Sequence, residues 1–286
     1  MTANPNVNVK RKDNRSLLAK YAAAPHIVWA VLFIIMPLIF IAYYAFTDMD
    51  GVFSVSNLAE FFSPAYLKIF LRSVRLSLIS TAICLVIGYP IAYFISRTKP
   101  NTQKLLVLLI MLPMWMNFLI RTYAIMVIIQ DTGIIGAFLK GFGIESLGLI
   151  GTETAVVLGM VYDYLPYMIL PIYSVLAKMD YKLVEAASDL GCNGFAVLRK
   201  VIIPLSLSGI VSGVTMVLVP SISTFYISQK LGSPDTLLIG DIIEQQYASY
   251  NYNMAAALSF VLMLILVVGL AVANKYTDED EGGMMP

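Results

Sequence analysis

The segment KMDYKLVEAASDLGCNGFAVLRKVIIP, residues 178–204, joins two long apolar stretches and differs from every other loop of the chain. Apolar side chains recur three and four positions apart between positions 183 and 190, which predicts a short amphipathic helix, and Asp180 is a suitable N-cap residue. Gly191 stands where such a helix ends in a left-handed conformation. We predict a helix, a glycine turn and a second helical piece that re-enters apolar surroundings at Pro204.

The stretches around this segment are long enough to cross a bilayer. A helix needs about 20 apolar residues to span the hydrocarbon core, and four runs without Asp, Glu, Lys or Arg are 21 to 30 residues long. Two further apolar runs are interrupted by Arg121 and by Asp163. The sequence therefore predicts an all-α membrane protein, one unit at 21–273 with six transmembrane helices. Their expected positions are about 25–46, 70–96, 105–129, 154–177, 205–227 and 254–273.

The composition agrees with a membrane protein and excludes several soluble classes. Hydrophobic residues make up 59% of the chain and charged residues 13%, against about 45–50% and about 25% in soluble domains. A soluble globular enzyme, a disordered chain and a nucleic-acid-binding domain do not fit these values. Because the 286 residues include two cysteines and one histidine, we expect no metal site and no catalytic residues.

The first apolar run follows a basic segment, as the core of a signal peptide does. It is 27 residues long, whereas the apolar region of a signal peptide has about 7–15 residues. The residues after it, Thr47 to Asp50, are not a small-residue cleavage site. We therefore expect this run to be retained as a span.

The distribution of charge predicts the orientation, because Lys and Arg are enriched in loops that stay inside. With the N-terminus inside, 13 Lys and Arg residues fall on the inner side and 6 on the outer side. We predict that both termini are cytoplasmic, with a basic segment at 1–20, a cytoplasmic loop at 178–203 and an acidic tail at 274–286. The outer loops are acidic, which either attracts cations or keeps the loops solvated.

The spacing within the cytoplasmic loop resembles the EAA loop of ABC importer permeases. That loop reads E-A-A, three residues, G, nine residues and I-x-L-P. The matching positions here are Glu185, Ala186, Ala187, Gly191 and the stretch VIIP at 201–204. Val201 and Ile203 replace the usual Ile and Leu, which are mild changes.

The resemblance implies a role for this loop in ATPase coupling. In that family the loop forms a helix that docks in a groove of the ATP-hydrolysing subunit. Glu185 would make a polar contact there, Ala186 and Ala187 would pack closely, and Gly191 would form the turn. Asp189 and Pro204 complete the expected coupling set. The residues by themselves leave open a surface helix that packs on its own bundle.

Four further motifs are similar to the B-type permease of spermidine/putrescine importers, over about residues 25–273. They are IGYP at 87–90, LIRTY at 119–123, FYIS at 225–228 and LLIG at 237–240. This resemblance implies a type I ABC importer permease bundle in a bacterial inner membrane, in contact with membrane lipid. It also implies a polyamine substrate, a sister permease subunit, two copies of an ATP-binding subunit and an extracytoplasmic substrate-binding protein.

The nucleotide site is expected on another chain. The sequence contains no G-x-x-x-x-G-K-[ST] motif, which is the phosphate-binding loop of such ATPases. We therefore expect no enzymatic activity and no cofactor in this chain, with ATP and Mg held by the partner ATPase.

Asp163 is the most unusual residue within a predicted span. A carboxylate at the centre of a bilayer costs about 2.5–3.5 kcal/mol on insertion scales. It either lines the substrate path and attracts an ammonium group, or forms a structural pair, for instance with Arg121, or takes up a proton. Tyr162 and Tyr164 could add cation–π contacts, although tyrosines also anchor spans at interfaces. The other residues assigned to the path are Trp115, Asn117, Tyr123, Ser223 and Tyr226.

Three alternatives stay open at this stage. An importer of another solute, such as an amino acid, an anion or a metal chelate, would share the architecture, but the acid at Asp163 favours a cation. An ion-coupled secondary transporter often has two similar halves, and we find no internal repeat. A membrane enzyme is poorly supported by the lone His26.

The G-x-x-x-G motif at 209–213 permits close helix approach, and we favour packing within the chain over a subunit interface.

Overall fold

The structure is a computed structural model that describes residues 24–141 and 148–282. The predicted basic segment at 1–20 and the last four residues of the predicted tail lie outside the described residues. Within them the chain is almost entirely helical, and its one β feature is an isolated bridge between Thr47 and Phe53.

The elements follow one another without a sheet in the described ranges. In chain order they are α2 (Ala24–Ala30), η1 (Val31–Ile35), α3 (Met36–Ala45), α4 (Ser56–Glu60), α5 (Pro64–Ser96), α6 (Pro100–Trp115), α7 (Phe118–Ile129), α8 (Ile134–Lys140), α9 (Glu153–Leu176), α10 (Lys182–Asp189), α11 (Gly194–Val197), η2 (Leu198–Ile202), α12 (Ile203–Leu205), α13 (Leu207–Ile222), α14 (Tyr226–Leu231), η3 (Pro234–Thr236), α15 (Ile239–Ala248) and α16 (Tyr252–Gly282).

Five helices of the described part are long and apolar enough to cross a membrane, and a bent pair raises the number to six. The five are Pro25–Ala45, Pro64–Ser96, Phe118–Phe138, Glu153–Leu176 and Tyr252–Ala271. The bent pair is Gly194–Leu205 with Leu207–Ile222, which meet at 69°. The predicted all-α membrane fold is confirmed, with six spans when the bent pair counts as one.

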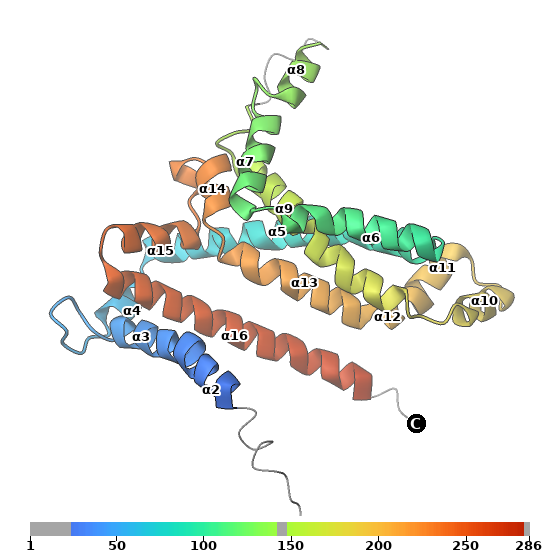
Figure 1. Cartoon of the computed structure of the whole chain (residues 1–286). Helices are drawn as coiled ribbons and strands as arrows, with labels where there is room; N and C mark the ends of the chain where they lie inside the picture. The colour runs from blue at the N-terminus through green and yellow to red at the C-terminus, as the bar shows by residue number, and fades with distance from the viewer. Residues whose placement is uncertain (1–23, 142–147, 283–286) are drawn as a thin grey trace, which may run out of the picture.

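The apolar stretch at 105–129 differs from the expected single span, because it forms two helices. Figure 1 shows α7 turned away from the direction of α6, and α8 continues the arm. Pro113 cannot donate to the helical ladder, and the backbone at Met116 is extended. Asn117 then begins a new helix, since its side chain accepts the N–H of Leu119 at 2.8 Å. The chain therefore bends where a proline and a capping residue lie close together.

Helix α9 is the centre of the bundle. Two thirds (67%) of its most apolar window is buried, against none of the window of the first span. Helices α5 and α13 pack on α9 through glycines: a Cβ atom at Gly88 or at Gly213 would meet the side chain of Met168 at 3.1 or 2.9 Å. A Cβ atom at Gly209 would meet the carbonyl of Pro171 at 3.0 Å. The G-x-x-x-G motif therefore packs within the chain, as favoured from the sequence.

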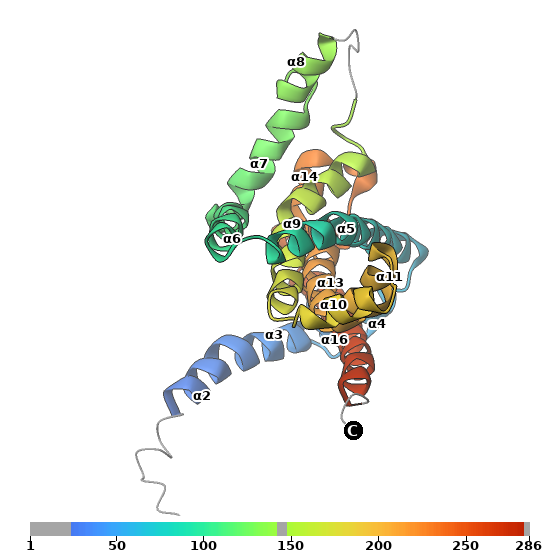
Figure 2. The ribbon, with the colours of Figure 1, turned by 90° about the vertical axis from the view of Figure 1, so that its right-hand side faces the viewer.

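The remaining helices define two ends of the bundle. Figure 1 shows α10 and α11 at one end, toward which the C-terminal end of α16 also points, and α4 and α15 at the opposite end. Figure 2 shows the first span, α2 to α3, diverging from the other helices. Its contact within the chain is with α16. The first span thus exposes most of its apolar surface.

The close approach of α13 to α9 predicts a large effect of side-chain volume at Gly213. Gly213→Leu should destabilise the fold by about 1–3 kcal/mol, because Met168 cannot move without disturbing α9. Gly269→Leu is the matched control, since nothing lies within 4 Å of a Cβ atom at that position. Thermal unfolding of the purified protein in detergent measures both variants. Equal midpoints for the two variants would contradict the packing described here.

Candidate functional site

Asp163 and Arg121 form a buried ion pair between α9 and α7. The Nε of Arg121 donates to Oδ1 of Asp163, and the side chains are 4% and 0% exposed. The hydroxyl of Thr122 lies 2.9 Å from the other oxygen, Oδ2. Both carboxylate oxygens are therefore hydrogen-bonded, as a charge in apolar surroundings requires.

The same arginine also closes the break between α6 and α7. Its Nη1 donates to the carbonyl of Pro113 at 3.0 Å, a group that the interrupted helix leaves with few partners. The ring of Phe118 lies 5.8 Å from the guanidinium carbon. One side chain thus joins α6, α7 and α9 at the point where the chain bends.

These contacts bear on the two roles considered for Asp163. The carboxylate is enclosed and paired in this conformation, as the structural alternative requires, and it does not face an open cavity. Tyr164 is also buried, and its hydroxyl lies 3.4 Å from the carbonyl of Pro220 on α13. Tyr162, on the opposite side of α9, is 38% exposed.

The other residues assigned to the substrate path do not converge on Asp163. Trp115 and Tyr123 are 68% and 52% exposed, and Asn117 serves as the cap of α7. Tyr226 is partly buried, with its ring 6.4 Å from that of Phe118. Ser223 is exposed and lines a groove between α3, α13, α15 and α16.

The coupling loop has the local structure that its sequence indicates. The N-cap residue of α10 is Tyr181, without a side-chain cap, and not the expected Asp180. Asp180 lies one residue earlier, and its side chain accepts the N–H of Lys182 at 3.0 Å. Gly191 has a φ of +82°, which favours glycine. The N–H of Cys192 reaches back to the carbonyl of Ala187 at 3.1 Å, the pattern of a Schellman C-cap. The side chain of Asn193 then caps α11.

Helix α10 turns its expected apolar face outward. Val184 is 7% exposed and packs toward the second part of the loop, α11 and η2. Leu183 and Leu190 are 48% and 85% exposed, and Glu185 and Ala186 are exposed as well. The predicted stripe is therefore covered by this chain only in part: Leu183, Ala186 and Leu190 are exposed, whereas Ala187 packs against the core that contains Val184.

Sequence reasoning missed the residue that holds the coupling loop to α5. The guanidinium carbon of Arg97 lies 5.1 Å from the ring centre of Tyr93 and 4.5 Å from that of Tyr181. Its Nε and Nη2 are buried without a hydrogen-bond partner. Two aromatic faces therefore stabilise this cation. The four-residue spacing of Tyr93 and Arg97 is visible in the sequence, but the contact with Tyr181 is not.

Helix α15 carries two carboxylates at the opposite end of the bundle, outside the candidate spans. Asp241 is 1% exposed, and its Oδ2 accepts the N–H of Leu238 at 2.7 Å. Burial raises the pKa of Asp241 to about 6, and the neighbouring charge of Glu244 acts in the same direction. Glu244 is partly exposed. Over the described ranges no group of three His, Cys, Asp or Glu side chains could hold a metal ion.

The fold and the loop define a class, a polytopic helical membrane protein with a helical loop, α10 and α11, between two of its spans. The family model "binding-protein-dependent transport system inner membrane component" matches residues 84–276. The chain belongs to this family of ABC importer permeases, whose members are membrane transport subunits.

Known relatives and a solved structure agree with this family. The chain is 38% identical to the spermidine/putrescine transport system permease protein PotB of Haemophilus influenzae, over 86% of this chain and 91% of the relative. It is 34% identical to PotB of Escherichia coli strain K12, over 85% and 92%. A bacterial ABC transporter involved in alginate import has the same fold, with a TM-score of 0.75, 16% identity and coverage of 93% and 96%.

The buried pair predicts that its two partners depend on each other. Arg121→Gln should destabilise the fold by about 3–5 kcal/mol, because it leaves Asp163 buried and unpaired. The double variant with Asp163→Asn should recover much of this loss. Arg75→Gln is the matched control, because its pair with Glu153 is exposed and worth about 0–1 kcal/mol.

Thermal unfolding and membrane abundance are measured for Arg121→Gln, Asp163→Asn and the double variant. Additive effects of the two substitutions would show that the pair does not couple α7 to α9. Transport by the double variant then separates the two roles of Asp163. Retained transport assigns Asp163 to structure, and transport lost at normal abundance assigns it to the path.

Proposed function

We propose that this chain is the permease subunit of an ATP-driven importer for polyamines such as spermidine and putrescine. The observation that carries the proposal is the 34–38% identity to spermidine/putrescine permeases over 85–86% of the chain. The likeness covers the bundle and the loop alike. The alginate importer shares the fold at 16% identity, so it supports no acidic polysaccharide cargo.

Coupling to an ATPase is the second part of the proposal. Helix α10 exposes Leu183, Ala186 and Leu190 at one end of the bundle, and an apolar face in water favours burial against another protein. A groove of a partner ATPase would cover this face, with Glu185 at its polar edge. Arg97 would transmit the movement of the loop to α5, since it touches Tyr181 and ends that helix.

The full assembly would contain partners beyond the ATPase. Two ATPase copies would hold ATP and Mg, a sister permease would complete the path, and an extracytoplasmic binding protein would deliver the polyamine at the end opposite α10. Both termini would be cytoplasmic in a bacterial inner membrane. The C-terminal end of α16 and the coupling loop at one end of the bundle support this orientation.

Transport would follow alternating access. Closure of the ATPase dimer would move α10, and the linked helices would change from an inward-facing to an outward-facing arrangement. The helical segment that ends with α12 meets α13 at 69°. A displacement of the loop would therefore act on this span at an angle to its axis. The ion pair of Arg121 and Asp163 would keep α7 attached to α9 while these helices move.

Uptake of radiolabelled spermidine and putrescine tests the proposed cargo. Bacterial cells that lack this chain should lose uptake of at least one polyamine, and the wild-type chain should restore it. Equal uptake with and without the chain would contradict the polyamine assignment. The variant Leu190→Glu in the restored cells serves as a control, because it should lower only the uptake that depends on coupling through α10.

The coupling role predicts a defect without unfolding. Gly191→Val should lower uptake by about tenfold or more, because a β-branched residue resists a φ of +82° and would redirect α10. Gly194→Val is the matched control, since Gly194 has no positive φ and open space around it. Uptake is compared at equal membrane abundance. Normal uptake by Gly191→Val would count against the docking role of α10.

A further inference from the structure

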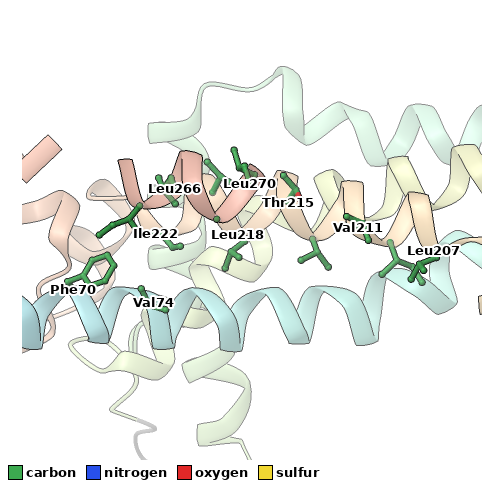
Figure 3. Close-up of a pocket in the computed structure, with 14 residues that line it drawn as sticks. Phe70, Val74, Leu207, Val211, Thr215, Leu218, Ile222, Leu266 and Leu270 are labelled. Atoms are coloured by element: carbon green, nitrogen blue, oxygen red, sulfur yellow. The ribbon is translucent and has the colours of Figure 1, made fainter. Parts of the chain in front are cut away.

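Two grooves of very different chemistry flank α16. The first, of about 540 Å³, lies between α5, α13 and α16, and Thr215 is its one polar side chain. Figure 3 shows its wall, with Phe70 and Val74 on α5 facing Leu218 and Ile222 on α13. Such a surface is suited to any apolar occupant. It offers no group that would select a ligand.

The second groove, of about 850 Å³, contains a carboxylate. It lies between α3, α13, α15 and α16, and Glu244 is its one charged residue. In the part of the chain that the structure describes, no Lys or Arg side chain is within 4.0 Å of this carboxylate. Its hydrogen bond is from the amide of Gln229, at 3.2 Å to Oε2. Glu244 can therefore accept a cation without breaking an ion pair.

Aromatic side chains line the groove together with Glu244. Tyr44, Phe225, Tyr247 and Tyr252 all line the groove, and the rings of Tyr247 and Tyr252 are 5.3 Å apart. An ammonium group over the faces of such rings is attracted by their negative quadrupole. A carboxylate together with aromatic faces is chemistry that selects an organic cation over an anion or a neutral sugar.

The rest of the groove is apolar and follows α16 through Leu262, Met263 and Leu266. Methylene groups can lie along this wall at no electrostatic cost, whereas a second ammonium group there would lack a counter-ion. The groove therefore fits one charged end and the adjoining aliphatic chain. Two serines interrupt this apolar lining: Ser259 on α16, and Ser223 at the end of α13, which was assigned to the substrate path from the sequence.

We propose that this groove is a binding site for a terminal ammonium group of an aliphatic polyamine, with Glu244 as its counter-ion and Tyr247 and Tyr252 as its aromatic walls. The site rests on the proposed function, because it concerns the cargo of that importer. It lies at the end opposite α10, where the substrate would arrive. A sister permease helix or a lipid chain are the other possible occupants, and the experiment separates them.

Cysteine accessibility in membrane vesicles with the assembled importer tests the site. Cys84 and Cys192 are replaced by alanine and Ser223 by cysteine, so that one thiol reports on the groove. We measure its reaction with aminoethyl methanethiosulfonate, a cation, and with sulfonatoethyl methanethiosulfonate, an anion. The ratio of the two reaction rates, cation to anion, should be about fivefold higher in the protein with Glu244 than in the Glu244→Gln variant. Spermidine should slow the reaction in the presence of Glu244 only.

Glu60→Gln is the matched control, because Glu60 is an exposed carboxylate at the same end but outside the groove. The proposal is overturned if spermidine gives no protection, or if it protects the Glu244→Gln variant equally well. A thiol that reacts in the isolated chain and not in the importer shows a groove covered by the sister subunit, which also overturns it. If Ser223→Cys does not assemble, Ser259→Cys replaces it, because Ser259 lines the groove and is not one of the proposed contacts.

The two proposals fail separately. Wild-type polyamine uptake without spermidine protection refutes the site and leaves the importer function standing. Spermidine protection in a chain on which no polyamine uptake depends supports the site and refutes the proposed cargo transport.

Discussion

The hydrocarbon core of a membrane leaves no polar group without a partner, and in this chain the ion pair of Arg121 and Asp163 meets that requirement for three helices at once. The carboxylate is satisfied by Arg121 and Thr122, and the arginine satisfies the carbonyl at the break of α6. Loss of either partner would leave the other charge buried and unpaired. The pair links the arm of α7 and α8 to α9.

The sequence predicts the membrane fold and the local structure of the coupling loop because both follow from local patterns. Apolar run length indicates the spans, and Gly191 marks the C-terminal end of α10. The division of 105–129 depends on Asn117 acting as a cap, which a hydropathy pattern does not register. The pair of Arg121 with Asp163 is one of the alternatives that the sequence raises, but the contact of Arg97 with Tyr181 joins distant parts of the chain, so that three-dimensional packing alone identifies it.

The arrangement places different chemistry at the two ends of one bundle. At one end α10 exposes Leu183 and Leu190, and the stack of Tyr181 on Arg97 holds this loop to α5. At the other end a carboxylate and aromatic rings line the groove of Glu244. Closely packed helices join the two ends through α9 and α13. In the proposed mechanism, this connection would transmit a movement at α10 to the far end.

The central claim is that this chain works as the membrane subunit of an ATPase-driven importer. Native mass spectrometry of the complex purified from bacterial membranes through a tag on this chain tests it most directly. The account predicts one copy of this chain, one sister permease and two ATPase subunits in a single particle. A stable particle that contains this chain and no ATPase would contradict it.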